Sequence, residues 1–251
     1  MSNPFVHLEL STSDVAAAKT FYSGLFGWAI QDMDMGGGMI YSTFKPVSGP
    51  GGGMFSMPGM PTFWLAYVGV KDINDSTEKA KSLGATIHKG PMEIPNIGWM
   101  TILVDPTGAT IAMFQPKDGA QQPPPGNAGS SPFVHLELCS PDVAAAKSFY
   151  SALFGWAFTD TDMGGGLIYS TFHPSSGPGG GLFTMPGVPN AWLAYVGVED
   201  INASTDKAKS LGATVYRGPH EIPNIGWFTI LGDPTGATIA LFQATPKPSA
   251  Q

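Results

Sequence analysis

The sequence predicts an α+β protein built from four copies of one unit, in which a strand is followed by a helix and three further strands. Two observations support this prediction. Residues 4–115 align with residues 132–243 without a gap, and 86 of the 112 aligned positions are identical. Within each copy the same order of segments occurs twice. The chain therefore contains two copies of one domain, and each domain contains two of the units.

The opening strand, residues 4–10, occurs unchanged at residues 132–138. Its side chains alternate between two faces with the period of a β-strand. The apolar face, which we expect to pack against a helix, consists of Val6, Leu8 and Leu10. The opposite face, which we expect to point away from the helix, consists of Phe5, His7 and Glu9.

Capping residues and helical periodicity predict two helices in each domain. In the first domain, one helix covers residues 15–25, follows Asp14, whose carboxylate can cap it, and is ended by Phe26-Gly27. A second helix covers residues 73–83, follows Asp72 and is closed by Gly84. Each predicted helix comes directly after a predicted strand, as the repeated unit requires.

The remaining strands are predicted from alternating or β-branched segments that are separated by glycine and proline. In the first domain they are expected at about residues 28–33, 39–44, 53–57, 63–70, 86–90, 98–104 and 109–115. The glycine-rich segments 36–38 and 49–53 are expected to be hairpin turns or a mobile rim.

The segment between the two copies, residues 117–131, is rich in proline, glycine and polar residues. We interpret it as an extended linker between a first domain at residues 1–116 and a second domain at residues 132–244. Residues 245–251 are interpreted in the same way as a flexible tail.

Charge and composition exclude several classes of partner. The net charge of −7 does not provide the basic surface that a nucleic-acid-binding protein needs. The sequence contains no apolar segment of about 20 residues that could span a bilayer. Cys139 is the only cysteine, so an intrachain disulfide is impossible. We therefore expect a cytoplasmic protein that binds neither nucleic acid nor a membrane.

An ordered set of short motifs resembles the vicinal oxygen chelate superfamily of glyoxalases, bleomycin-resistance proteins and dioxygenases. The motifs of the first copy are His7-Leu-Glu-Leu10, Asp14-x4-Lys-x-Phe-Tyr22, Leu25-Phe-Gly-Trp28, Lys81-x-Leu-Gly-Ala85, Asp105-Pro-Thr-Gly108 and Ile111-Ala-Met-Phe-Gln115. The resemblance implies two glyoxalase-like domains, each a half-open, eight-stranded mixed sheet that is cupped around a ligand site, with helices on its outer face. It also implies that the domains pack on each other, in a monomer or a homodimer.

Alternation along the strands predicts which side chains line each cup. The ligand-binding candidates of the first domain are Phe5, His7, Glu9, Leu65, Tyr67, Trp99 and Phe114. Those of the second domain are Phe133, His135, Glu137, Leu193, Tyr195, Trp227 and Phe242. Gly98 leaves the phase of its strand open, so Met100 is the alternative to Trp99 in the first cup.

Enzymes of the superfamily usually bind one divalent cation, such as Ni, Zn, Mn or Fe, through ligands on four strands of the cup. The resemblance places the first ligand at His7, but two other ligand positions fall on Leu65 and Ala112. No His, Asp or Glu occurs in the fourth strand around residues 54–57, and the second copy retains only His135. We therefore expect no bound metal or other cofactor; His7 and His135 are the fallback ligands.

Two functional hypotheses follow. The missing metal ligands and the apolar cup favour a protein that binds a small, mostly apolar molecule in each domain. The alternative is a lyase, isomerase or dioxygenase of the same superfamily that uses a divalent metal with a non-standard ligand set. A metal-free enzyme would use the catalytic candidates His7 and Glu9, with His135 and Glu137 in the second copy, for proton transfer. Otherwise these side chains are only the polar lining of a binding pocket.

Overall fold

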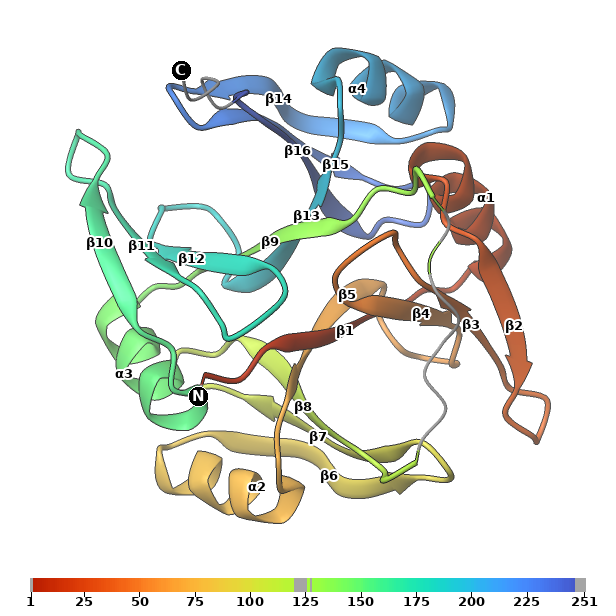
Figure 1. Cartoon of the computed structure of the whole chain (residues 1–251), viewed down its shortest axis with the longest axis vertical. Helices are drawn as coiled ribbons and strands as arrows, with labels where there is room; N and C mark the ends of the chain where they lie inside the picture. The colour runs from red at the N-terminus through yellow and green to blue at the C-terminus, as the bar shows by residue number, and fades with distance from the viewer. Residues whose placement is uncertain (1, 120–125, 127, 247–251) are drawn as a thin grey trace.

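The computed structural model describes residues 2–119, 126 and 128–246, and its first domain contains one eight-stranded sheet and two helices (Figure 1). The first unit consists of β1 (Phe5–Ser11), α1 (Val15–Phe26), β2 (Ile30–Asp34), β3 (Ile40–Phe44) and β4 (Gly51–Phe55). The second unit consists of β5 (Phe63–Gly69), α2 (Ile73–Ser82), β6 (Thr86–Ile94), β7 (Gly98–Val104) and β8 (Thr110–Pro116).

The second domain repeats this arrangement. Its first unit consists of β9 (Phe133–Cys139), α3 (Val143–Phe154), β10 (Phe158–Asp162), β11 (Ile168–Phe172) and β12 (Gly179–Phe183). Its second unit consists of β13 (Ala191–Gly197), α4 (Ile201–Ser210), β14 (Thr214–Ile222), β15 (Gly226–Gly232) and β16 (Thr238–Ala244). The predicted α+β fold of four βαβββ units is confirmed.

Both sheets are mixed and curved. The strand order of the first sheet is β2-β3-β4-β1-β5-β8-β7-β6. The two units join where β1 pairs antiparallel with β5. On either side of this central pair the neighbours are parallel, because β1 pairs with β4 and β5 pairs with β8. The first strand of each unit therefore lies at the middle of the sheet, where its side chains are flanked on both sides.

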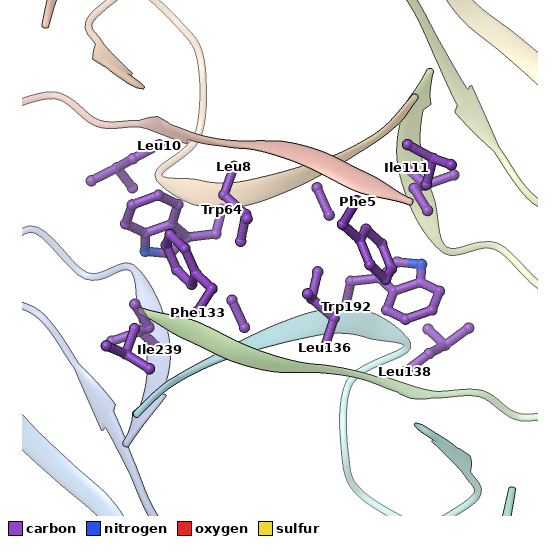
Figure 2. Packing of buried hydrophobic residues seen from close by; sticks show 14 of the residues in the cluster. Phe5, Leu8, Leu10, Trp64, Ile111, Phe133, Leu136, Leu138, Trp192 and Ile239 are labelled. Atoms are coloured by element: carbon purple, nitrogen blue, oxygen red, sulfur yellow. The ribbon is translucent and has the colours of Figure 1, made fainter. Parts of the chain in front are cut away.

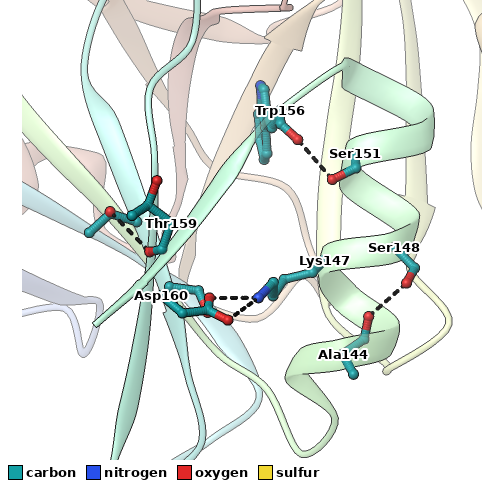
Figure 3. A network of polar contacts seen from close by, with 9 residues as sticks. Ala144, Lys147, Ser148, Ser151, Trp156, Thr159 and Asp160 are labelled. Atoms are coloured by element: carbon teal, nitrogen blue, oxygen red, sulfur yellow. Dashed lines mark hydrogen bonds and ion pairs between the residues drawn. The ribbon is translucent and has the colours of Figure 1, made fainter. Parts of the chain in front are cut away.

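Each domain's first helix is fixed to its own sheet by capping and by an ion pair. Asp142 caps α3 by accepting a hydrogen bond from the backbone N–H of Ala145. Lys147 on α3 pairs with Asp160 on β10 at 2.6 Å, and Ser151 donates to the carbonyl of Trp156 at 2.8 Å (Figure 3). These contacts hold the helix beside the outer strands of its sheet.

The glycine-rich segment 49–53, expected to be a turn or a mobile rim, instead contributes residues to strand β4. Gly51, Gly52 and Gly53 pair with β1 in the middle of the sheet. A Cβ atom on Gly52 would lie 2.3 Å from the ring of Phe44, so a larger residue would collide with that ring. The prediction was wrong because these glycines make room for aromatic rings of the neighbouring strand β3.

The largest apolar cluster is shared by the two domains (Figure 2). Leu8, Leu10 and Trp64 of the first domain face Leu136 and Trp192 of the second across the space between the sheets. The outer, helix-bearing faces of the two sheets therefore pack on each other, and the opposite faces, which form the cups, point away from the interface.

Phe5 and its counterpart Phe133 belong to this interdomain core and not to the cups. Phe5 is 2% exposed and packs against Trp156 at 5.2 Å between ring centroids. A β-bulge lies between Phe5 and His7, because Phe5 pairs with Val68 while His7 pairs with the adjacent Tyr67. The extra residue reverses the alternation. The predicted cup positions of Phe5 and Phe133 were therefore wrong; the same bulge turns Val6 toward the cup.

Polar contacts also connect the domains, in symmetric pairs. The Tyr22 hydroxyl donates to Asp233 at 2.7 Å, and Tyr150 donates to Asp105 at 2.8 Å. Trp156 donates its indole N–H to the backbone carbonyl of Asn3 at 2.7 Å. Because these groups are buried and satisfy one another across the interface, they specify one relative placement of the domains.

The predicted linker, residues 117–131, and the predicted tail, residues 245–251, lie in part outside the described residues. Among the residues that are described, no helix is long and apolar enough to cross a membrane.

Candidate functional site

The inner face of each sheet carries a separate apolar cluster. In the first domain its buried members are Leu65, Tyr67, Met100 and Ala112. Half-buried apolar side chains surround them, namely Val6, Phe63, Met92, Ile94, Ile102 and Phe114. In the second domain the corresponding cluster consists of Tyr195, Phe228 and Ala240, with Val134, Leu193, Ile222, Ile230 and Phe242 around them. Each cup is thus a partly exposed apolar surface on a rigid sheet.

A chain of four polar side chains crosses the floor of the first cup. His7 Nε2 lies 2.7 Å from the Tyr41 hydroxyl. The Tyr41 hydroxyl donates to Glu9 Oε2 at 3.0 Å. The Tyr67 hydroxyl donates to the other carboxylate oxygen, Glu9 Oε1, at 2.8 Å. The two oxygens of this carboxylate are therefore each held by a phenol.

The second cup contains the same chain. His135 Nε2 lies 2.7 Å from the Tyr169 hydroxyl. Tyr169 and Tyr195 donate to the two oxygens of Glu137, each at 2.8 Å. The arrangement is therefore a reproducible property of the domain.

These hydrogen bonds determine the tautomer of the histidine. Tyr41 has one proton, and it donates that proton to Glu9. With Glu9 ionised and accepting from Tyr41, His7 Nε2 carries a proton and donates it to the Tyr41 oxygen. The neutral imidazole is left with Nδ1 as its acceptor.

Burial shifts the pKa of the histidine and that of the glutamate in the direction that favours the neutral form of each side chain. Burial lowers the pKa of His7 to about 4, and that of His135 to about 4 as well. Burial raises the pKa of the Glu9 carboxyl, while the hydrogen bonds from Tyr67 and Tyr41 and the charge of Lys89 oppose that rise. The cup thus contains a neutral imidazole and a carboxyl group with an elevated pKa.

The structure brings most of the predicted cup residues together. His7, Glu9, Leu65 and Tyr67 lie on the two central strands, with cross-strand pairs His7–Tyr67 and Glu9–Leu65. Phe114 lies beside them in the same cluster. Their counterparts His135, Glu137, Leu193, Tyr195 and Phe242 occupy the second cup.

Trp99 and Trp227 do not line the cups. Trp99 packs against the helix-side core, while its neighbour Met100 is buried in the cup. Phe228 takes the place of Met100 in the second domain, where the Arg217 guanidinium lies 5.4 Å from the centre of its ring. Trp99 and Trp227 were therefore placed on the wrong face. Because of Gly98, the sequence did not show which side chains of this strand face the cup. The pairing of β7 with β6 and β8 determines that orientation.

Tyr41 and Tyr169 are site residues that the sequence analysis missed. Tyr41 lies on β3, two strands from Glu9, and its ring extends across Gly53 of β4. A Cβ atom on Gly53 would lie 2.2 Å from the Tyr41 hydroxyl, so only glycine leaves this path open. The signal in the sequence was Gly53 itself, since a glycine inside a strand often marks a close approach by another group.

The donor atoms around His7 in the first cup differ from the ligand set that the superfamily resemblance implies for a divalent metal. Tyr67 lies beside His7 and Ala112 lies beside Tyr67, so the strand positions next to the histidine offer no carboxylate or imidazole. His7 Nε2 is already bonded to Tyr41. Within the described parts of the chain, no three His, Cys, Asp or Glu side chains come together. A structural or catalytic metal needs at least three such protein ligands in most known sites.

Two cupped sheets of paired βαβββ units define the class of glyoxalase-like proteins. The chain matches the model of the Glyoxalase/Bleomycin resistance protein/Dioxygenase superfamily over residues 5–113 and 133–241. These two segments make up most of the chain, and the protein therefore belongs to this superfamily.

Named relatives match nearly the whole chain. "Putative glyoxylase CFP32" of Mycobacterium tuberculosis is 32% identical over 248 residues, which cover 96% of this chain and 94% of the relative. "Anthracycline biosynthesis protein DnrV" of Streptomyces peucetius is 29% identical over 258 residues, covering 94% and 91%. The 2,3-dioxygenase LapB of Pseudomonas sp. KL28 superimposes with a TM-score of 0.69 at 15% identity, covering 100% and 96%. This last similarity shows the fold alone.

Proposed function

We propose that each domain binds one small, mostly apolar and planar molecule in its cup, and that the molecule presents a hydrogen-bond donor to Glu9 or Glu137. The observation that carries this proposal is the phenol-held carboxylate in an otherwise apolar surface. A binding site of this composition takes ligands with an apolar body and few polar groups. We also propose a cytoplasmic location for the protein, which contains a single cysteine.

The acceptor positions left free on Glu9 and His7 indicate which hydrogen-bonding group the ligand carries. An ionised carboxylate has about four acceptor positions. Tyr41 and Tyr67 occupy two of those on Glu9, which leaves positions for a donor from the ligand. The Nδ1 atom of His7 is a second acceptor. A hydroxyl, phenol or N–H group of the ligand is therefore favoured over a carbonyl or an anion.

The relatives support a planar ligand. The Streptomyces relative is named for anthracycline biosynthesis, and anthracyclines are planar fused-ring molecules that carry phenolic hydroxyls. The name of the mycobacterial relative indicates a glyoxylase, whereas the strand positions beside His7 in this chain carry Tyr67 and Ala112. Binding of a planar molecule is therefore the function that the site favours.

The donor requirement can be tested with two planar probes that differ only in their hydroxyls. Anthraflavic acid, a 2,6-dihydroxyanthraquinone whose hydroxyls lie away from its carbonyls, should bind with a stoichiometry of two per chain in a fluorescence-quenching titration. Anthraquinone, which has no hydroxyl, should bind about 10–100-fold more weakly, because a hydrogen bond to a charged group contributes about 1.5–3 kcal/mol. In the Glu9→Gln/Glu137→Gln variant, the difference between the two probes should disappear.

Glu78→Gln is the matched control, because Glu78 is an exposed carboxylate on α2 whose partner is Lys81. It should preserve both the stoichiometry and the difference between the probes. Equal affinity of the wild-type protein for the two anthraquinones would contradict the proposed role of Glu9, and no binding of either probe would contradict a planar ligand.

We also propose that the cups act without a divalent metal, since the strand positions beside His7 carry Tyr67 and Ala112. Protein purified without chelators should contain less than about 0.1 mole of Ni, Zn, Mn or Fe per domain by elemental analysis. Addition of these metals should leave the melting temperature unchanged, because only a ligand that binds the native state stabilises it. About one mole of metal per domain, or a metal-induced rise that His7→Ala/His135→Ala removes, would overturn this proposal.

A further inference from the structure

The second domain has a pocket that is separate from the cup, at the N-terminal end of α4. Its volume is about 310 Å³. Trp227 forms one wall, and this side chain packs against the helix-side core and not against the cup. The pocket is lined by Glu199, Asp200, Ile201, Asn202, Trp227 and Gln243.

The first domain shows what this kind of position can hold. There the ammonium of Lys117 lies 5.9 Å from the ring centre of Trp99, which is the counterpart of Trp227. Lys117 also forms an ion pair with Glu93 at 3.2 Å. A cation over the face of an indole is attracted by the negative potential of the ring. The first domain thus covers its own tryptophan with a cation.

The second domain has no lysine at this point. The backbone follows the same path, because the N–H of Lys117 donates to the carbonyl of Ile97 and the N–H of Thr245 donates to that of Ile225, both at 2.9 Å. Thr245 therefore stands where Lys117 stands in the first domain. Its side chain is too short to extend across the indole of Trp227.

The net charge of the residues around this tryptophan also differs between the two domains. In the first domain the surrounding positions carry Lys71, Asp72, Glu93 and Lys117, which have no net charge. In the second domain the same positions carry Glu199, Asp200, Glu221 and Thr245, a net charge of −3. Among the described residues, no lysine or arginine forms an ion pair with any of these three carboxylates. The partial positive charge of the helix N-terminus, about half a unit, does not offset them.

We propose that the Trp227 pocket binds the ammonium group of a small organic amine. The ammonium lies over the indole of Trp227, as that of Lys117 lies over Trp99. Glu199, which lines the pocket, and Glu221, which is the cross-strand partner of Trp227 on β14, neutralise it. The pocket is at the lower end of the volumes typical of ligand sites, so a short alkylamine fits it better than a polyamine or a peptide. The site faces away from the cup and can be occupied independently of it.

The test is an NMR titration of the tryptophan indole N–H signals with n-butylammonium, assigned with the Trp227→Phe variant. The Trp227 signal should shift and saturate in the millimolar range, while that of Trp99 should not move. The neutral analogue n-butanol should cause no saturable shift. Thr245→Lys, which restores the lysine of the first domain, should weaken binding at least about tenfold, because the cation–π position is then filled.

Thr238→Lys is the matched control, since Thr238 is exposed at the opposite end of β16 and adds the same charge away from the pocket. It should leave the butylammonium affinity within about twofold of the wild-type value, because exposed charges at this distance are screened by salt. A non-saturating shift, an equal response to butanol, or unchanged affinity in Thr245→Lys would overturn the proposal.

Discussion

Replacing Phe5 by alanine is expected to lower the free energy of unfolding by about 3–5 kcal/mol, the usual cost of removing a buried phenylalanine. Phe5 is 2% exposed and its ring contacts Trp156, Phe172 and Trp192, all of which belong to the second domain. The cavity would therefore open inside the interface between the two sheets. Urea unfolding followed by tryptophan fluorescence and by circular dichroism measures the loss.

Phe114→Ala is the matched control for this substitution. Phe114 lies in the cup and is only half-buried, so its loss should cost about 1–2 kcal/mol, in proportion to the smaller apolar area that it buries. Phe133→Ala should resemble Phe5→Ala, because Phe133 packs against Trp28 at 5.2 Å in the symmetric position. Equal costs for Phe5→Ala and Phe114→Ala would show that Phe5 is not a core residue.

Acidification from pH 7 to pH 4 is expected to destabilise the Glu9→Gln/Glu137→Gln protein by about 3 kcal/mol for each cup. The pKa of His7 is 6.5 in its ordinary state and about 4 in the folded protein. The unfolded chain therefore binds the proton first, so this contribution to stability is complete above pH 6.5 and is lost as the pH falls to about 4. A difference of 2.5 in pKa corresponds to about 3 kcal/mol.

The wild-type protein should lose less stability over the same range. Burial raises the pKa of Glu9, so its contribution has the opposite sign: it is complete below pH 4.5 and is lost as the pH rises through the folded-state pKa. In the wild-type protein the two contributions oppose each other, and the glutamine variant isolates that of the imidazoles. Free energies of unfolding from urea titrations at several pH values measure the difference.

Removing the imidazoles as well identifies their part in the acid response. His7→Asn/His135→Asn in the glutamine background should abolish most of the loss between pH 6.5 and pH 4. His88→Gln is the control, because His88 is exposed on β6; this substitution should leave the acid response unchanged. An acid response that persists without His7 and His135 would show that these two imidazoles are not the buried neutral groups.

Local periodicity accounts for much of the site. His7 and Glu9 are two residues apart, and so are Leu65 and Tyr67; a strand must point such pairs to the same side. Both pairs are in the cup, opposite each other on β1 and β5. The pattern of cap, helix and glycine likewise predicted the four helices to within one residue at nearly every end.

Periodicity fails where a partner strand alters the phase. The bulge after Phe5 exists because β1 pairs with β5 in a shifted register, and no local pattern in residues 4–10 shows it. The phase of Trp99 and Met100 depends in the same way on β7 lying between β6 and β8. Each error placed a helix-side residue in the cup in place of its neighbour in the sequence: Phe5 instead of Val6, and Trp99 instead of Met100.

The sequence by itself determined the duplication, the order of the elements and the face that carries His7 and Glu9, because these depend on residues that are close together in the chain. The tertiary structure decided what these side chains contact. Tyr41 reaches Glu9 across Gly53 only after three strands are aligned side by side. The pocket at Trp227 likewise combines this side chain with the N-terminal end of α4 and with Gln243 of β16, which come together only in the folded chain.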